Sequence, residues 1–162
     1  MDGKIMHTED PWLTEAEQHA WRSYLRASRH LEVRLDNELQ SAGLSFAEYE
    51  LLSMLSEAPD GTMRMSALAE QIVQSRSRVT HTANRLERRS WVTRSNALED
   101  RRGVLLALTP SGWDTVRRAS RVHVNGVRQH FIDQIDQADL GVLGQAMDEV
   151  RRHLTGQDTA VS

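Results

Sequence analysis

Residues 74–102 read QSRSRVTHTANRLERRSWVTRSNALEDRR, and this stretch decides the fold. Its apolar residues Val79, Ala83 and Leu86 recur at helical spacing, which predicts an amphipathic helix from about residue 76 to 89. Polar and basic side chains occupy the opposite side of this helix. The pattern therefore predicts a helix with one face in a core and one face in solvent.

A predicted β-hairpin follows that helix directly. Residues 91–95 and 103–109 alternate or run apolar like strands, and residues 96–102 form the predicted tip between them. Upstream, Ser66 is placed to cap a short helix over residues 67–73. Two short helices joined by a tight turn and followed by a hairpin are typical of a winged helix-turn-helix.

The outward face of the second helix has the chemistry of a DNA-reading surface. Its members point away from the apolar stripe and carry hydrogen-bond donors or guanidinium groups: Ser77, His81, Asn84 and Arg88, flanked by Arg78 and Arg85. Such donors read base edges, and such arginines contact phosphates. An ordinary solvated face is the alternative, but it normally mixes charges, and Glu87 is the only acid between Arg76 and Arg94.

The charge of the chain is distributed unevenly. Its formal net charge is −3, yet residues 63–102 contain nine arginines against four acids, a net +5. Residues 1–62 carry a net −7. A basic block in an acidic chain is typical of a protein that contacts a polyanion with one face only.

The remaining chain predicts four longer helices. Capping-box spacings at Thr14 and Ser45 begin helices that end near Gln40 and Glu57, and Gly43 stops the first of them. Thr109 caps a helix predicted to reach about residue 134, and Asp136 caps a last helix to about residue 154. We therefore expect a mainly α fold with about six helices.

Composition excludes several classes of protein. The 162 residues contain no cysteine, so disulfides and thiolate chemistry are ruled out. No apolar run is long enough to span a membrane and no signal-peptide pattern begins the chain, so we expect a cytoplasmic protein without membrane contact. No catalytic or phosphate-cradling motif is present, so we expect neither an enzyme nor a cofactor.

Residues 100–112, DRRGVLLALTPSG, resemble the wing signature of the MarR (multiple antibiotic resistance regulator) family of winged helix-turn-helix transcriptional regulators. Upstream, Leu68-Ala69-Glu70, Val79-Thr80 and the segment Asn84 to Arg89 are similar to the family's helix-turn-helix. Both pieces occur in order and at the family's separation. The resemblance covers about residues 15–154.

The resemblance implies a homodimer that binds double-stranded DNA at a pseudo-palindromic operator, acts as a repressor and releases DNA on binding a small aromatic or anionic ligand. It assigns residues 14–44 and 110–154 to dimerisation and residues 45–109 to the winged helix-turn-helix. The sequence outside the helical pattern predicts a flexible lead over residues 1–13 and a disordered tail over residues 155–162. It places these residues in or beside the major groove: Ser75, Arg76, Ser77, Arg78, Thr80, His81, Asn84 and Arg85. It places Arg94, Arg101 and Arg102 on the wing, with Arg102 in the minor groove and Asp100 holding it in position.

Two further sites are open to interpretation. Aromatic and basic residues form a candidate ligand pocket that binds an aromatic carboxylate: Trp21, Arg22, Tyr24, His30 and Tyr49. Packing at a dimer interface is the alternative for the aromatic members. His123 and His130 form a candidate metal pair, but their seven-residue spacing separates them by about 10 Å, so the alternative is a pair of structural histidines.

Three other functions use the same fold. The first is an architectural DNA-binding protein that responds to no effector, and the second is a metal-responsive regulator. The third is a protein-interaction module that no longer binds DNA. A large ratio of specific to non-specific affinity distinguishes an operator-binding regulator from an architectural protein.

Overall fold

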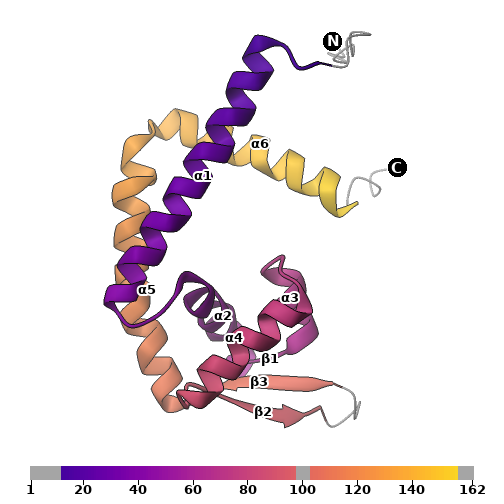
Figure 1. Ribbon diagram of the computed structural model, residues 1–162, viewed down its shortest axis with the longest axis vertical. Coiled ribbons are helices and arrows are strands. Elements are labelled where there is room, and N and C mark those ends of the chain that lie inside the picture. Colours follow the sequence, from indigo (N-terminus) through magenta and orange to yellow (C-terminus); the bar gives the residue numbers. More distant parts are fainter. Residues whose placement is uncertain (1–11, 98–102, 157–162) are drawn as a thin grey trace.

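The computed structural model describes residues 12–97 and 103–156, and it places a small winged module at one end of two long helices (Figure 1). The helices are α1 Glu15–Ser41, α2 Phe46–Glu57, α3 Met65–Gln71, α4 Arg76–Arg88, α5 Pro110–His130 and α6 Gln137–Thr155, with 3-10 turns η1 Pro59–Gly61 and η2 Ile132–Gln134. The strands are β1 Thr62–Arg64, β2 Val92–Asn96 and β3 Val104–Leu108. The predicted mainly α winged helix-turn-helix is confirmed.

The three strands form one antiparallel sheet in the order β1-β3-β2. In its register Thr62 faces Ala107, while Val92 faces Leu108 and Asn96 faces Val104. The β2–β3 hairpin is therefore the predicted wing. Its tip, with Asp100, Arg101 and Arg102, lies outside the described residues.

Helix caps account for most of the element boundaries. Thr14 and Ser45 both form complete capping boxes with the glutamates three residues later, as predicted. Thr109 caps α5 by accepting a hydrogen bond from the backbone N–H of Gly112 at 3.0 Å. Gly43 ends α1 with a φ of +83°, a conformation that glycine adopts without steric cost.

Two predicted boundaries are wrong. Ser66 does not cap α3, because that helix begins at Met65, immediately after β1, and its N-cap Arg64 makes no side-chain cap hydrogen bond. The helix predicted to reach residue 134 ends at His130, where Phe131 leaves the helical conformation and a 3-10 turn follows. Asp136 does occupy the N-cap of α6, although its side chain makes no cap hydrogen bond.

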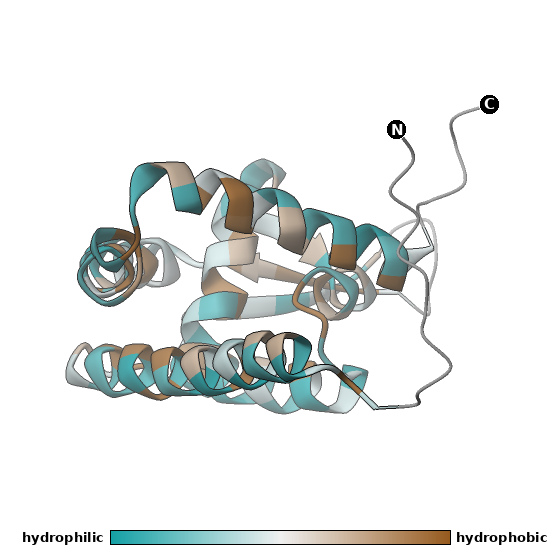
Figure 2. Ribbon diagram, turned by 90° about the horizontal axis from the view of Figure 1, so that it is seen from above, coloured by the Kyte–Doolittle hydropathy of each residue, from teal (hydrophilic) through white to brown (hydrophobic). Residues whose placement is uncertain are grey.

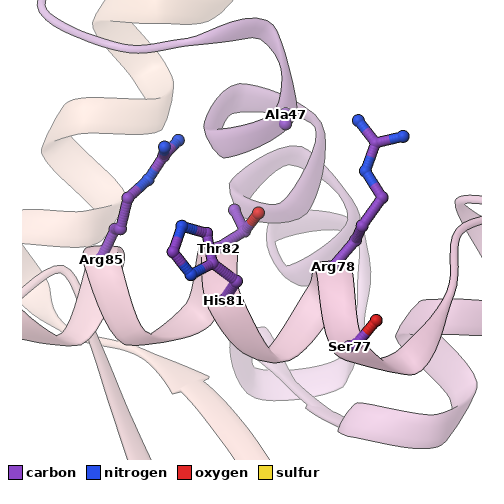
Figure 3. Close-up of a pocket in the computed structure, with 6 residues that line it drawn as sticks. All are labelled: Ala47, Ser77, Arg78, His81, Thr82 and Arg85. Atoms are coloured by element: carbon purple, nitrogen blue, oxygen red, sulfur yellow. The ribbon is translucent and has the colours of Figure 1, made fainter.

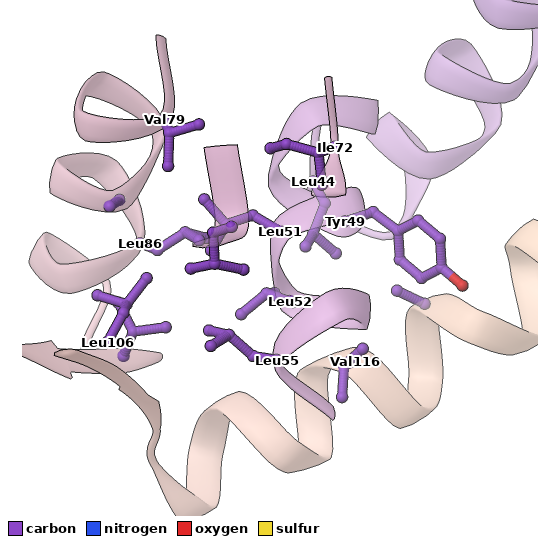
Figure 4. Packing of buried hydrophobic residues seen from close by; sticks show 14 of the residues in the cluster. Leu44, Tyr49, Leu51, Leu52, Leu55, Ile72, Val79, Leu86, Leu106 and Val116 are labelled. Atoms are coloured by element: carbon purple, nitrogen blue, oxygen red, sulfur yellow. The ribbon is translucent and has the colours of Figure 1, made fainter. Parts of the chain in front are cut away.

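The core of the winged module is built around α2. Leu51, Leu52 and Leu55 are fully buried, and Val79 and Leu86 of α4 pack against the same cluster (Figure 4). Burying one such side chain contributes roughly 1.5–3 kcal/mol. One face of α4 is thereby fixed in the core, and its other face is directed to solvent.

The terminal helices, in contrast, leave apolar surface uncovered. No residue of α6 is buried. Figure 2 shows brown, hydrophobic positions spaced along the outer helices. The exposed apolar side chains of α1 and α6 include Trp21, Tyr24, Val142, Val150 and Leu154. An apolar stripe without a partner is typical of an interaction surface.

Candidate nucleic-acid interface

The outward face of α4 is an exposed polar surface of the winged module. Ser75 begins the helix by accepting a hydrogen bond from the backbone N–H of Arg78 at 3.3 Å. Because Val79, Ala83 and Leu86 hold the opposite face in the core, the predicted DNA-contacting residues of α4 other than Arg85 are exposed. Exposed side chains on this face are Ser75, Arg76, Ser77, Arg78, Thr80, His81, Asn84 and Arg88.

A strained turn precedes the helix. Val73 has a φ of +52° and is 91% exposed. A β-branched residue in the left-handed region is unusual, and such strain costs on the order of 1–3 kcal/mol. The next residue anchors the turn, since the Gln74 side-chain amide donates to Glu50 Oε2 at 2.9 Å. The turn therefore fixes the direction in which α4 begins.

The arginines of this region fall into two groups. Arg76, Arg78 and Arg88 make no side-chain hydrogen bond or ion pair with any described residue. Arg85 is different: its Nε lies 3.1 Å from Glu48 Oε1, and its Nη2 donates to Ser45 Oγ at 3.0 Å. Arg85 was predicted at the DNA, but the structure gives its guanidinium partners within the fold.

Arg89 and Arg94 are also engaged. Arg89 Nη1 donates to the Gly43 carbonyl at 2.7 Å and lies 3.8 Å from Glu48 Oε2, while its guanidinium covers the Trp91 ring at 3.7 Å. Arg94, on β2, donates to Glu87 Oε2 at 2.9 Å and thereby ties the base of the wing to α4. Contact between Arg94 and DNA stays a prediction.

Two cavities open between α4 and α2. The smaller, of about 380 Å³, lies between α4 and the N-terminal turn of α2 and is drawn in Figure 3. The larger, of about 810 Å³, lies between α1, the start of α2 and α4. Its charged lining consists of Arg29, Glu32, Asp36, Glu50, Arg78 and Arg85.

The larger cavity holds a perturbed carboxyl group. Burial and the neighbouring Glu32 raise the pKa of Glu50, and Arg78 partly offsets this shift. Asp36 is already occupied, because its carboxylate accepts the backbone N–H of Phe46 at 2.6 Å. The cavity therefore combines basic and acidic side chains with the apolar side chains of Val33 and Phe46.

The structure does not bring the predicted ligand-pocket residues together. Trp21 and Tyr24 stack on each other with ring centroids 6.1 Å apart, and both are half exposed. Arg22 and His30 are exposed on the same helix, whereas Tyr49 is buried beneath α5 with its hydroxyl 3.4 Å from Ser120. None of these five lines the larger cavity. No sequence motif marks the residues that do line it.

The two histidines of the candidate metal pair have separate surroundings. His123 packs on the Tyr49 ring with centroids 4.5 Å apart. Burial lowers its pKa, and its buried Nδ1 has no hydrogen-bond partner among the described residues. His130 Nε2 lies 2.6 Å from Glu38 Oε1. Among the described residues no group of three or more histidine or acidic side chains is arranged to hold a metal ion.

Comparisons with known proteins agree with this geometry. The sequence model of the MarR family matches residues 44–104. AbsC, a MarR family transcriptional regulator from Streptomyces coelicolor, is 42% identical in sequence to this chain. The match covers 91% of this chain and 99% of AbsC, and the crystal structure of AbsC superposes with a TM-score of 0.86. Sco3205, a MarR family transcriptional regulator from the same organism solved in complex with DNA, is 39% identical, with coverages of 91% and 93% and a TM-score of 0.86.

A curated relative gives the same assignment. The uncharacterized HTH-type transcriptional regulator YfiV of Bacillus subtilis (strain 168) is 30% identical over 97 residues, 60% of this chain. The matched segment spans about three fifths of YfiV, 59% of its length. These relatives are regulators and not enzymes. Along the described chain, no helix has the length and hydropathy needed to cross a membrane. The chain belongs to the MarR family of transcriptional regulators.

Proposed function

We propose that this protein is a homodimeric, sequence-specific DNA-binding repressor that releases its operator when a small ligand binds. In this proposal each α4 enters the major groove and each wing reaches the adjacent minor groove. A two-fold dimer places its half-sites about one helical turn, roughly 10 base pairs, apart, so the operator is pseudo-palindromic. Repression follows because the bound dimer blocks access to the promoter.

The exposed face of α4 carries this proposal. Arg76, Arg78 and Arg88 project from the helix without an intramolecular partner in the described chain, beside the hydrogen-bonding side chains of Ser77 and Asn84. Free guanidinium groups contact phosphate or guanine, whereas paired ones do so at a cost. The DNA complex of the 39% identical Sco3205 supports the same use of the fold in a relative.

The uncovered terminal helices support the dimer. Val142, Val150 and Leu154 of α6 are at least half exposed, and so are Trp21 and Tyr24 of α1. A second copy that covers these side chains removes the apolar surface from water. Sedimentation of the full chain should show a dimer, and Val150→Asp should dissociate it. A full chain that sediments as a monomer at micromolar concentration would contradict this part of the proposal.

The duplex preference is tested by selecting DNA from a random pool with the purified protein. We expect a two-fold symmetric motif, with an affinity for it at least about 10³-fold above that for random duplex. Selection of bent or A-tract DNA without a motif favours an architectural protein. Absence of duplex binding at low salt contradicts any DNA-binding function.

The larger cavity is the proposed effector site. Its volume of about 810 Å³ suits a small molecule, and Arg29 and Arg78 with Phe46 offer charge and an aromatic face to an aromatic anion. Because the cavity lies between α1 and α4, an occupant can change the orientation of α4 relative to the dimerisation helices. Aromatic carboxylates should release DNA from the parent, and Val33→Trp, which narrows the cavity, should weaken this response while DNA binding persists.

A further inference from the structure

The smaller cavity beside α4 contains polar groups that contact with DNA bases would not require. It lies where the recognition face of α4 meets the first turn of α2, and its volume of about 380 Å³ is far larger than one phosphate group needs. Figure 3 shows Arg78 and Arg85 on either side of it, with His81 and Thr82 between them and Ala47 on the facing helix.

The first turn of α2 offers one unused backbone donor to this cavity. The N–H of Phe46 donates to Asp36 at 2.6 Å, and the N–H of Glu48 donates to Ser45 Oγ at 3.2 Å. The N–H of Ala47, between them, has no hydrogen-bond partner among the described residues. A free N–H at a helix N-terminus is a donor for anions, and the helix dipole adds to its attraction.

Thr82 supplies an independent observation. This residue is 7% exposed, and its hydroxyl makes no hydrogen bond with any described residue. Figure 3 shows the hydroxyl directed toward α2, into the cavity. The Thr82 oxygen is not among the fully buried, unpaired side-chain atoms of the described chain, so the hydroxyl reaches the open space of the cavity and is available to an incoming group.

The charges around the cavity favour an anion. Arg78 is exposed and has no ion-pair partner within the described chain, and His81 is exposed beside it. Three carboxylates lie near these arginines. Glu48 pairs with Arg85 at 3.1 Å and Asp36 accepts the Phe46 N–H. Glu50 interacts electrostatically with Arg78, and burial and Glu32 raise its pKa, which favours its neutral form. An incoming anion therefore meets donors that are free and carboxylates that are compensated.

We propose that this cavity is a binding site, called here the phosphate seat, for one phosphate of the DNA backbone. The Ala47 N–H, the Thr82 hydroxyl and the Arg78 guanidinium hold that phosphate. This inference rests on the proposed DNA-binding function and adds a contact outside the base-reading face. The contact carries no sequence information. It fixes how deeply α4 enters the groove and in which register.

The first test is Thr82→Val, which keeps the shape of the side chain and removes the hydroxyl. The variant should be about as stable as the parent, because no hydrogen bond within the described chain is lost, yet it should bind the selected operator about tenfold more weakly. Thr115→Val is the matched control. Thr115 is 3% exposed and its hydroxyl donates to the Ser111 carbonyl at 2.8 Å, so this change should lower stability and leave operator affinity unaltered.

The second test replaces single operator phosphates with neutral methylphosphonates. In the parent complex, one position in each half-site should lose affinity, and the loss there should shrink in Thr82→Val because the two changes remove the same contact. Unchanged binding by Thr82→Val, or equal losses in parent and variant at every position, overturns the seat alone. A parent that binds no duplex overturns the proposed function and the seat with it.

Discussion

The two ends of α4 use arginine in opposite ways. Near its N-terminus, Arg76 and Arg78 project into solvent without a partner in the described chain. Near its C-terminus, Arg85 and Arg89 converge on the buried carboxylate of Glu48. At the C-terminal end two arginines are therefore bound within the fold while Arg88 stays unpaired in the described chain, whereas both arginines at the N-terminal end are unpaired there.

The difference follows from what each end faces. The C-terminal end lies against the corner between α1 and α2, where Ser45 and Glu48 cap α2 and the Gly43 carbonyl is accessible. The N-terminal end emerges from the strained turn at Val73. Acids lie near it, Glu70 on α3 and Glu50 across the larger cavity, but among the described residues neither forms an ion pair with Arg76 or Arg78. Arginines that share a helix and a charge can thus divide into a structural set and a set available to a ligand.

Removing the carboxylate should produce the largest effect. Glu48→Ala leaves Arg85 and Arg89 without their partner and deletes half of the capping box on α2. Because both guanidinium groups are more than a third exposed and can recover water, we expect a loss of about 2–3 kcal/mol in unfolding free energy, less than for a fully buried pair. Urea denaturation measures this loss. Glu48→Gln keeps the cap and should lose less; an unaltered midpoint for Glu48→Ala would show that the C-terminal end is not anchored in this way.

The next prediction compares an unpaired arginine of α4 with a paired one in a DNA-binding assay. Arg78→Gln should lower the slope of log affinity against log salt by about 0.9, the contribution of one phosphate contact, with little change in stability. Arg85→Gln should leave the slope unaltered and lower stability, because its guanidinium is bound to Glu48 and Ser45. Equal slope changes in the two variants would remove the distinction between the ends of the helix.

Sequence patterns predict the structural elements correctly where the contacts that form them are local. Caps at Thr14, Ser45 and Thr109 and the apolar stripe of α4 depend on residues a few positions apart, and each was identified correctly. The partner of Arg85 lies some forty residues away at Ser45 and Glu48, so no local pattern could separate it from Arg78.

The wrong start of α3 and the separation of the candidate ligand-pocket residues within one chain have the same physical origin. The start of α3 depends on its direct connection to β1, and the dispersal of the predicted ligand-pocket residues depends on which side of α1 faces the winged module. Helical spacing placed Trp21 and Tyr24 near arginines, but it could not show that the cavity forms along a different part of the helix. Buried Thr82 carries no sequence signal at all, since threonine in a helix is common on either face.

The strained turn offers a prediction of intermediate size. Val73→Gly relieves a left-handed conformation but increases the freedom of the unfolded chain, so we expect a net gain of about 1 kcal/mol in stability. The same change should weaken operator binding, because the start of α4 is held less rigidly. Chemical denaturation and a binding titration measure the two effects; reduced stability would mean that Val73 makes contacts that compensate for its conformation.

The smallest expected effect concerns the helix that supports the anchored end. His123 of α5 packs on Tyr49 of α2, and burial lowers its pKa below the ordinary value of about 6.5. Below that pH the unfolded chain takes up the proton before the folded one, so stability falls as the pH decreases from about 6.5 toward the folded-state pKa and is unaffected above it. Urea midpoints at pH 7.5 and 5.5 should differ less for His123→Phe than for the parent. Since α2 carries Glu48, acidification should loosen the anchored end of α4 before it alters the free end, and an equal pH dependence in parent and variant would exclude His123 as the cause.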